Sequence, residues 1–129
     1  MPRRSPVLTD LEMDIMRIVW EKGEATVRDV YERMRENRSL AYTTVMTVMS
    51  TLARKGVVER KMVGRAYLYR PKVSQEEAIR RTLRYLAGKL LDGSARSLAA
   101  HLIESEDLSK EDLKELRRMI EERLKEEGG

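Results

Sequence analysis

Short hydroxyl side chains gather between residues 41 and 56, at a spacing that would place them on one side of a helix. One face of that helix carries hydroxyls and an arginine: Thr43, Thr47, Ser50 and Arg54. The opposite face is apolar, with intervals of three and four residues: Val45, Val48, Met49 and Leu52. An ordinary solvated helix would show Glu and Lys on its outer face. An uncharged hydrogen-bonding face favours close contact with a polar partner, and we predict the major groove of DNA.

Two residues complete this segment. Gly56 ends the predicted helix, as a glycine at the C′ position commonly does. Met46 flanks the hydroxyl face, where it either contacts a thymine methyl group or packs against the protein. The sequence leaves both roles of Met46 open.

Catalytic chemistry has no comparable pattern. The single histidine, His101, lies beside Leu98 and Leu102 without a neighbouring nucleophile or set of metal ligands. The chain has no cysteine, which excludes disulfides, thiolate metal sites and cysteine nucleophiles. Acidic clusters at residues 104–107 and 121–122 fall at helix ends or on exposed faces, and no glycine-rich phosphate loop is present. We therefore predict no enzyme, no metal site and no cofactor.

Charge is distributed unevenly along the 129 residues. Residues 1–72 hold 15 Lys and Arg against 9 Asp and Glu, a net charge of +6, whereas residues 73–129 hold 11 against 13, a net charge of −2. This asymmetry is expected when one part of a chain meets phosphates and the other does not. No apolar run approaches the roughly 20 residues that cross a bilayer, and residues 1–6 are not followed by a secretory apolar segment. We predict a cytoplasmic protein without a membrane partner.

The elements around the hydroxyl-bearing helix predict its setting. Capping boxes that begin at Thr9 and Thr26 open two earlier helices. Residues 57–63 and 66–70 are short, β-branched and aromatic-rich, which predicts strands, and Gly64-Arg65 between them suits a type II′ turn. Three helices followed by a basic hairpin are the order of a winged helix-turn-helix. The predicted fold class is mainly α with a small β-hairpin wing, and residues 1–72 form its DNA-binding domain.

Basic residues at the end of the third helix and on the hairpin would contact DNA phosphates. They are Arg54, Lys55, Arg60, Lys61 and Arg65. The alternative function is a winged helix used as a protein-interaction module in a larger assembly. Such a module should present an apolar third helix, whereas Thr43, Thr47 and Ser50 make this face polar. A DNA-binding homodimer is therefore the leading prediction.

The pattern of residues 73–129 predicts three further helices with narrow apolar stripes. Three helices of this size cannot bury all of these apolar residues among themselves. A second copy of the chain would cover them, so we predict a three-helix dimerisation domain. Its contact residues would be Ile79, Leu83, Leu86, Leu90, Leu98, Leu102, Leu113, Leu116, Ile120 and Leu124. A symmetric dimer would present two reading helices to a palindromic operator.

The sequence resembles the penicillinase-repressor (BlaI/MecI-type) family of transcriptional regulators over essentially its whole length. The motifs that carry the resemblance are LTDLE at residues 8–12 with Trp20, AYTTVMT at 41–47, RKG at 54–56, GRAY at 64–67 and EDLS at 106–109. The resemblance implies a repressor on a two-fold operator related to TACA/TGTA. It also implies base reading by Thr43, Thr44 and Thr47, with a wing at Gly64 and Arg65.

The resemblance also bears on how repression ends. Resistance-type members of the family are released by cleavage at an Asn-Phe bond in the fifth helix, which a membrane sensor triggers. The corresponding pair here is His101-Leu102, a departure that argues against this route and against a β-lactam role. Copper-responsive relatives use C-terminal cysteines, which this chain lacks. A protease or sensor that inactivates the protein is kept as an expected partner.

Overall fold

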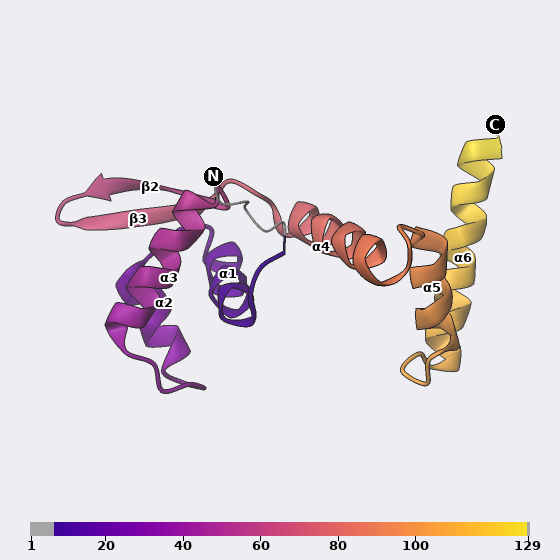
Figure 1. The fold of residues 1–129 in the computed structure, drawn as a ribbon, viewed down its shortest axis with the longest axis horizontal. Coiled ribbons are helices and arrows are strands. Elements are labelled where there is room, and N and C mark those ends of the chain that lie inside the picture. Colours follow the sequence, from indigo (N-terminus) through magenta and orange to yellow (C-terminus); the bar gives the residue numbers. More distant parts are fainter. Residues whose placement is uncertain (1–6, 129) are drawn as a thin grey trace. The chain divides into compact units, whose positions relative to one another are not determined.

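The computed structural model describes residues 7–128, and the expectation about residues 1–6 concerns a segment outside that range. Helices dominate the described residues and a small antiparallel sheet accompanies them, as predicted (Figure 1). The elements are α1 (Asp10–Lys22), β1 (Ala25–Thr26), α2 (Val27–Met34), α3 (Tyr42–Arg54), β2 (Val58–Val63), β3 (Ala66–Pro71), α4 (Gln75–Leu90), α5 (Ala95–Glu104) and α6 (Lys110–Gly128).

Local sequence signals set the ends of the first helices. At α1 the Thr9 side chain accepts a hydrogen bond from the Glu12 amide at 3.2 Å, and Glu12 Oε1 accepts one from the Thr9 amide at 2.8 Å. Thr26 and Asp29 form the same reciprocal pair at the start of α2. Gly23 ends α1 at a φ of 86°, a left-handed conformation that glycine adopts without steric cost. Both predicted capping boxes are therefore confirmed.

The hairpin forms where predicted, but its sheet has a third strand. β2 and β3 pair antiparallel, with Val63 opposite Ala66. Gly64 at the turn has a φ of 64°, and Asp92 is the only non-glycine among residues 7–128 with positive φ. Arg65 therefore has negative φ, as a type II′ turn requires. The hairpin prediction was incomplete, because β1 pairs with the other edge of β3, in the order β1-β3-β2.

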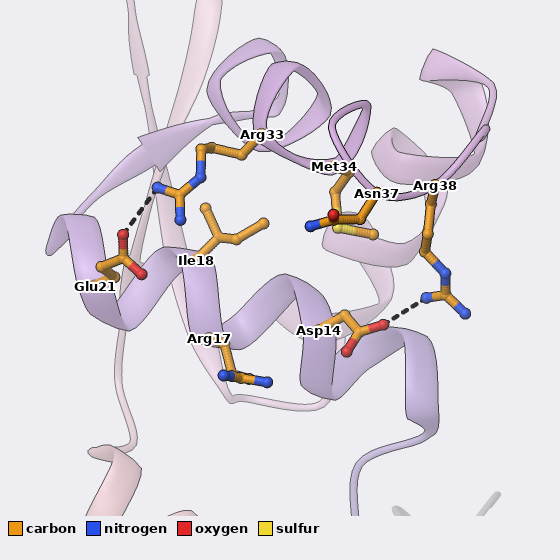
Figure 2. Close-up of a pocket in the computed structure, with 8 residues that line it drawn as sticks. All are labelled: Asp14, Arg17, Ile18, Glu21, Arg33, Met34, Asn37 and Arg38. Atoms are coloured by element: carbon orange, nitrogen blue, oxygen red, sulfur yellow. Dashed lines mark hydrogen bonds and ion pairs between the residues drawn. The ribbon is translucent and has the colours of Figure 1, made fainter.

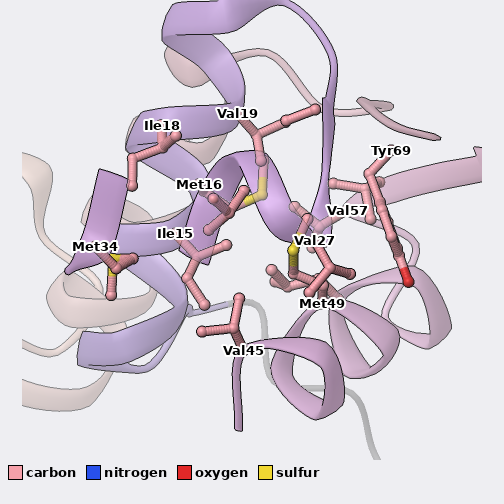
Figure 3. Packing of buried hydrophobic residues seen from close by; sticks show 14 of the residues in the cluster. Ile15, Met16, Ile18, Val19, Val27, Met34, Val45, Met49, Val57 and Tyr69 are labelled. Atoms are coloured by element: carbon pink, nitrogen blue, oxygen red, sulfur yellow. The ribbon is translucent and has the colours of Figure 1, made fainter. Parts of the chain in front are cut away.

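The first three helices and the sheet enclose one apolar core, shown in Figure 3. Ile15 and Val19 from α1 are fully buried, as are Val45 and Leu52 from α3. The predicted inner face of α3 is thereby confirmed at Val45, Met49 and Leu52, with Val48 partly buried against the core. Burial of this face turns the hydroxyls on the opposite side of α3 outward.

The chain divides into two compact units within α4. The winged-helix unit comprises the residues up to Tyr85, and the tail unit comprises those from Leu86 onwards. The predicted domain boundary, between residues 72 and 73, lies before α4. Trp20 Nε1 donates a hydrogen bond to the Val73 carbonyl at 2.9 Å, so the residues just before α4 are attached to α1. This bond makes the start of the connecting segment part of the winged-helix unit.

The tail unit has well-defined helices and no buried apolar centre. Ser94 and Ser109 accept cap hydrogen bonds at the starts of α5 and α6. Asp92 and Gly93, with φ values of 52° and 78°, separate α4 from α5. No residue of α5 or α6 is buried. None of the helices in residues 7–128 is long and apolar enough to cross a membrane.

Candidate nucleic-acid interface

The outer face of α3 presents the predicted hydroxyls. Thr43 and Thr47 are exposed, while Thr44 and Ser50 are half-buried at its margins. Ala41, the N-cap residue, supplies no side-chain acceptor to the first turn. The backbone amides of that turn therefore lack the internal cap that the helices α1 and α2 receive. Helix α3 offers an external partner both hydroxyl groups and the positive end of its dipole.

A groove separates α3 from the wing and collects most of the predicted contacts. From α3 it is lined by Tyr42, Met46, Thr47 and Ser50. From the sheet it is lined by Arg60, Arg65, Ala66, Tyr67 and Tyr69, and from the start of α2 by Thr26, Val27 and Arg28. These lining residues include three arginines and no carboxylate. The groove thus joins a hydrogen-bonding wall and a cationic wall.

Arg60 is held in this groove by a tyrosine ring and two hydrogen bonds. Its guanidinium lies 4.3 Å from the centre of the Tyr67 ring and donates to the Tyr69 hydroxyl at 3.2 Å. It also donates to Ser50 Oγ at 3.4 Å, which links the wing to α3. The hydrogen bond to Tyr69 raises the pKa of Arg60 above its ordinary value. Arg60 is therefore held as a permanent cation beside the hydroxyl face.

Two predicted phosphate contacts lie apart from this groove. Lys61 is exposed on the other face of β2, because successive residues of a strand point to opposite sides. Lys55 turns inward, and its Nζ lies 2.8 Å from Glu12 Oε1. The Lys55 side chain is 19% exposed, and the Glu12 side chain is 5% exposed. Lys55 thus has an intramolecular partner that the sequence did not indicate.

Arg54 and Arg65 are exposed cations at the two ends of the surface. Arg54 donates to Thr51 Oγ1 at 2.9 Å, and that hydroxyl donates to the Thr47 carbonyl at 3.0 Å. Gly64 and Arg65 form the tip of the wing, where both are exposed. The structure therefore brings Thr47, Ser50, Arg60 and Arg65 to one groove and places Arg54 one helical turn beyond Ser50.

Sequence reasoning missed seven lining residues of the groove, among them Arg28, Tyr42 and Tyr67, and left the role of Met46 open. The spacing of Tyr42, Met46 and Ser50, four residues apart, was a usable signal, because such residues form one ridge of a helix. Tyr67 could have been paired with Arg60 through their common face of the hairpin. Arg28 lay beyond this reasoning, since only the packing of α2 brings it to the groove.

A second hollow lies between α1 and α2, and Figure 2 shows its lining. Arg33 pairs with Glu21 at 2.8 Å, and Arg38 pairs with Asp14 at 2.6 Å. Each pair joins α2, or the turn that follows it, to α1. The Arg33 hydrogen bond and charge lower the pKa of Glu21. The charged groups of this hollow therefore connect the two helices, and Ile18 lies between the two pairs.

The predicted dimerisation residues remain largely uncovered. Leu90 is 74% exposed and Leu124 is 63% exposed, while Leu98 and Leu116 are half-buried. The other members of the predicted set are all exposed: Ile79, Leu83, Leu86, Leu102, Leu113 and Ile120. Exposed apolar side chains are therefore present on each of α4, α5 and α6.

His101 makes a local contact and belongs to no cluster of ligands. It is exposed on α5, with Nδ1 2.8 Å from the Ser97 carbonyl oxygen. Within residues 7–128, no three His, Asp or Glu side chains are grouped so that they could hold a metal ion. The polar chemistry of the described residues is therefore concentrated at the groove beside α3.

Comparison with known proteins places this chain in a family. The model of the penicillinase repressor family matches residues 8–122. The transcriptional regulator BlaI of Mycobacterium tuberculosis is 36% identical over 106 residues, which cover 75% of this chain and 72% of that protein. The methicillin resistance regulatory protein MecI of Mammaliicoccus sciuri is 26% identical over 120 residues, which cover 93% of this chain and 98% of that protein.

A solved structure adds the fold. The DNA binding domain of the repressor BlaI aligns with a TM-score of 0.52 and 21% sequence identity, over 60% of this chain and 93% of that one. The predicted winged-helix fold is thereby confirmed. The family match over residues 8–122 covers most of the chain, including the wing and α4, α5 and most of α6. The chain belongs to the penicillinase repressor family, a family of transcriptional repressors and not of enzymes.

Proposed function

We propose that this protein represses transcription as a homodimer bound to a two-fold symmetric DNA operator. The observation that carries the proposal is the groove beside α3, whose described lining has three arginines, three hydroxyl-bearing residues of α3 and no carboxylate. A DNA surface is polyanionic outside and hydrogen-bonding inside its grooves. A groove without negative charge beside a hydroxyl-lined helix complements both properties. Family membership supports the same function.

The arginines and the hydroxyls of this surface would contact different parts of the DNA. Arg65, at the tip of the wing, would contact phosphates, and Arg54 would do so beyond the end of the hydroxyl face. Hydroxyls of α3 would contact base edges: Thr43, Thr44, Thr47 and Ser50. Hydroxyls discriminate less sharply than bidentate arginine–guanine pairs, so one half-site binds modestly. Two half-sites on one operator would supply the remaining affinity.

The tail units of two copies would form the dimer contact. Most of the predicted contact residues are exposed in a single chain, and none of the residues of α5 or α6 is buried. Covering these stripes with the same stripes of a second copy removes apolar surface from water. An isologous contact of this kind generates two-fold symmetry. The operator of a symmetric dimer is then expected to be palindromic.

Release from DNA would act through α5. His101 and Leu102 occupy the position that the resemblance assigns to the cleaved bond, and both side chains are exposed. A protease or sensor of different specificity is the partner that the proposal includes. Repression and release of this kind would take place in the cytoplasm, where DNA is available.

A gel-shift titration with DNA from upstream of the protein's own gene tests the proposal. We expect retardation that weakens as salt rises, because bound phosphates release counterions. Arg65→Ala should reduce the slope of log affinity against log salt by roughly 0.9 per subunit. Arg96→Ala, an exposed arginine of α5, is the matched control and should leave the slope unchanged. Sedimentation of each variant verifies that the dimer is intact.

Two outcomes would contradict the proposal in different ways. An unchanged slope for Arg65→Ala would remove the wing from the interface and leave α3 alone. No retardation at low salt, with the dimer intact, would exclude operator binding at this DNA. Together with failure to select any sequence from random duplex DNA, that result would favour the protein-interaction module instead.

A further inference from the structure

Met46 is an exposed apolar side chain beside the hydroxyls of α3. It keeps 44% of its surface accessible, although it lies on α3 between two residues of the buried face. It belongs neither to the buried core nor to the partly buried side chains that pack against it. Met46 is therefore not a core residue, and its exposed surface remains available to a partner.

The neighbours of Met46 place it inside the groove. Tyr42, Met46 and Ser50 follow at intervals of four residues and form the ridge of α3 that faces the wing. Tyr42 is fixed by an edge contact with Tyr31, whose ring centre lies 5.4 Å away. Ser50 is fixed by the hydrogen bond from Arg60. Met46 thus lies between two anchored residues, and its unbranched side chain is free to adapt to a partner.

The chemistry of a methionine at this position selects one feature of DNA. Met46 carries no donor for a hydrogen bond and no charge, so phosphates and polar base edges gain little from it. In the major groove the thymine C5-methyl is the apolar group that the four bases present. The γ-methyl groups of Thr43 and Thr47 lie on a different ridge and extend less far from the helix.

We propose that Met46 contacts the C5-methyl group of one thymine in each half-site and makes that position specific for thymine. The inference rests on the proposed DNA-binding function and adds a residue that selects a base. The methyl contact should raise affinity roughly fourfold per half-site, which corresponds to burial of one methyl group. Two half-sites in one operator would then account for roughly sixteenfold.

Replacement of thymine by deoxyuridine provides the test, because it deletes the methyl group and leaves the hydrogen-bonding edge unchanged. The operator would be selected from random duplex DNA with the full-length wild-type dimer. Each thymine is then replaced in turn, in both half-sites together, and affinity is measured for wild type and Met46→Ala. We expect one position at which wild type loses affinity and Met46→Ala does not. At the other thymines the two proteins should respond alike.

Alanine is a suitable replacement because it has the highest helix propensity and Met46 is outside the core. Thermal melting of Met46→Ala should match wild type, which shows that the fold is unchanged. Met13→Ala is the matched control: Met13 lies on α1 and is 41% exposed. This control should retain the wild-type response at every thymine.

The outcomes separate the two levels of the argument. If wild type selects no DNA, the proposed function fails, and the role of Met46 fails with it. If wild type binds an operator but Met46→Ala and wild type respond equally at every thymine, only the Met46 assignment is overturned. If Met13→Ala also loses the response at the single position, the effect is not specific to Met46 and the assignment is overturned as well.

Discussion

The winged-helix unit and the tail unit are made of the same kind of capped amphipathic helix, yet only the first buries its apolar face. Ile15 and Leu52 are fully buried, whereas Leu90 and Leu124 are 74% and 63% exposed. Caps and periodicity determine where a helix begins and which residues share a face. Burial requires a second surface. The winged-helix unit supplies that surface itself, and the tail unit does not.

Both units have ion pairs within a helix, and the winged-helix unit also has ion pairs between helices. In the winged-helix unit, Arg33 and Glu21 join α2 to α1 at 2.8 Å. In the tail unit, Arg118 pairs with Glu115 and Glu122, one helical turn away on the same helix. The first pair restrains the packing of two helices, while the others stabilise α6 by itself. Tertiary order in the tail unit is therefore expected to depend on a partner.

The largest expected effect is loss of the dimer in Ile120→Asp. Ile120 is 50% exposed in the middle of the α6 stripe, and the proposed dimer would bury an unpaired carboxylate there in both copies. We expect the dimer dissociation constant to rise about a thousandfold, measured by sedimentation equilibrium. Lys114→Asp, on another side of α6, should leave the dimer intact. Dimerisation of Ile120→Asp at wild-type concentrations would exclude the α6 stripe from the interface.

Leu52→Ala should destabilise the winged-helix unit by about 3 kcal/mol, because it opens a cavity in a fully enclosed core. Urea unfolding followed by fluorescence of Trp20, the single tryptophan, measures this unit. Leu124→Ala makes the same change on an exposed residue of the tail unit and should leave the Trp20 transition unchanged. Equal effects of the two substitutions would mean that the units do not differ in self-sufficiency.

Lys55→Met should cost about 2 kcal/mol of unfolding free energy, because it leaves the buried Glu12 carboxylate without its cation. Lys61→Met, on the exposed face of β2, should change stability by less than about 0.5 kcal/mol. The salt slope of DNA binding should be the same for Lys55→Met and wild type. A slope reduced by roughly 0.9 per subunit would instead restore Lys55 as a phosphate contact.

Lys55 also shows which parts of this fold sequence reasoning reaches. Capping boxes, helical periodicity and the Gly64 turn depend on residues close together in the chain, and these elements were predicted. The contact of Lys55 with Glu12 spans 43 residues and depends on how α1 and α3 pack. Strand β1 is similar, because a two-residue segment becomes a strand only through its pairing with β3. Local patterns cannot encode either contact.

The candidate site divides along the same line. The hydroxyl face of α3 was predicted, because opposite faces of one helix follow from periodicity alone. The stack of Arg60 on Tyr67, and its bonds to Tyr69 and Ser50, were not, since they require the hairpin to lie beside α3. Sequence reasoning therefore predicted the hydroxyl-bearing helix and most of the cations around it. The structure adds which cations share a groove with that helix.

The smallest expected effect concerns two exposed carboxylates, Glu21 and Glu115. Hydrogen bonds from Arg33 and Arg118, respectively, lower the pKa of each below the ordinary value of 4.5. A lowered pKa adds stability above pH 4.5 that is lost as the pH falls through the folded-state value. Glu21→Gln should therefore slightly lower the midpoint of the unfolding transition that Trp20 fluorescence reports at pH 7. The difference in midpoint from wild type should vanish in acid. Exposure keeps this effect small.

Glu115→Gln is the counterpart in the tail unit and should follow the same pH dependence through a different observable. Its pair with Arg118 stabilises one helix, so the loss should appear in the far-ultraviolet circular dichroism of α6 and not in the Trp20 transition. The comparison is decided by fluorescence melts of both variants between pH 7 and pH 3. A shift of the Trp20 transition by Glu115→Gln as large as that by Glu21→Gln would show that the units unfold together. The burial difference between them would then not describe how the protein loses its structure.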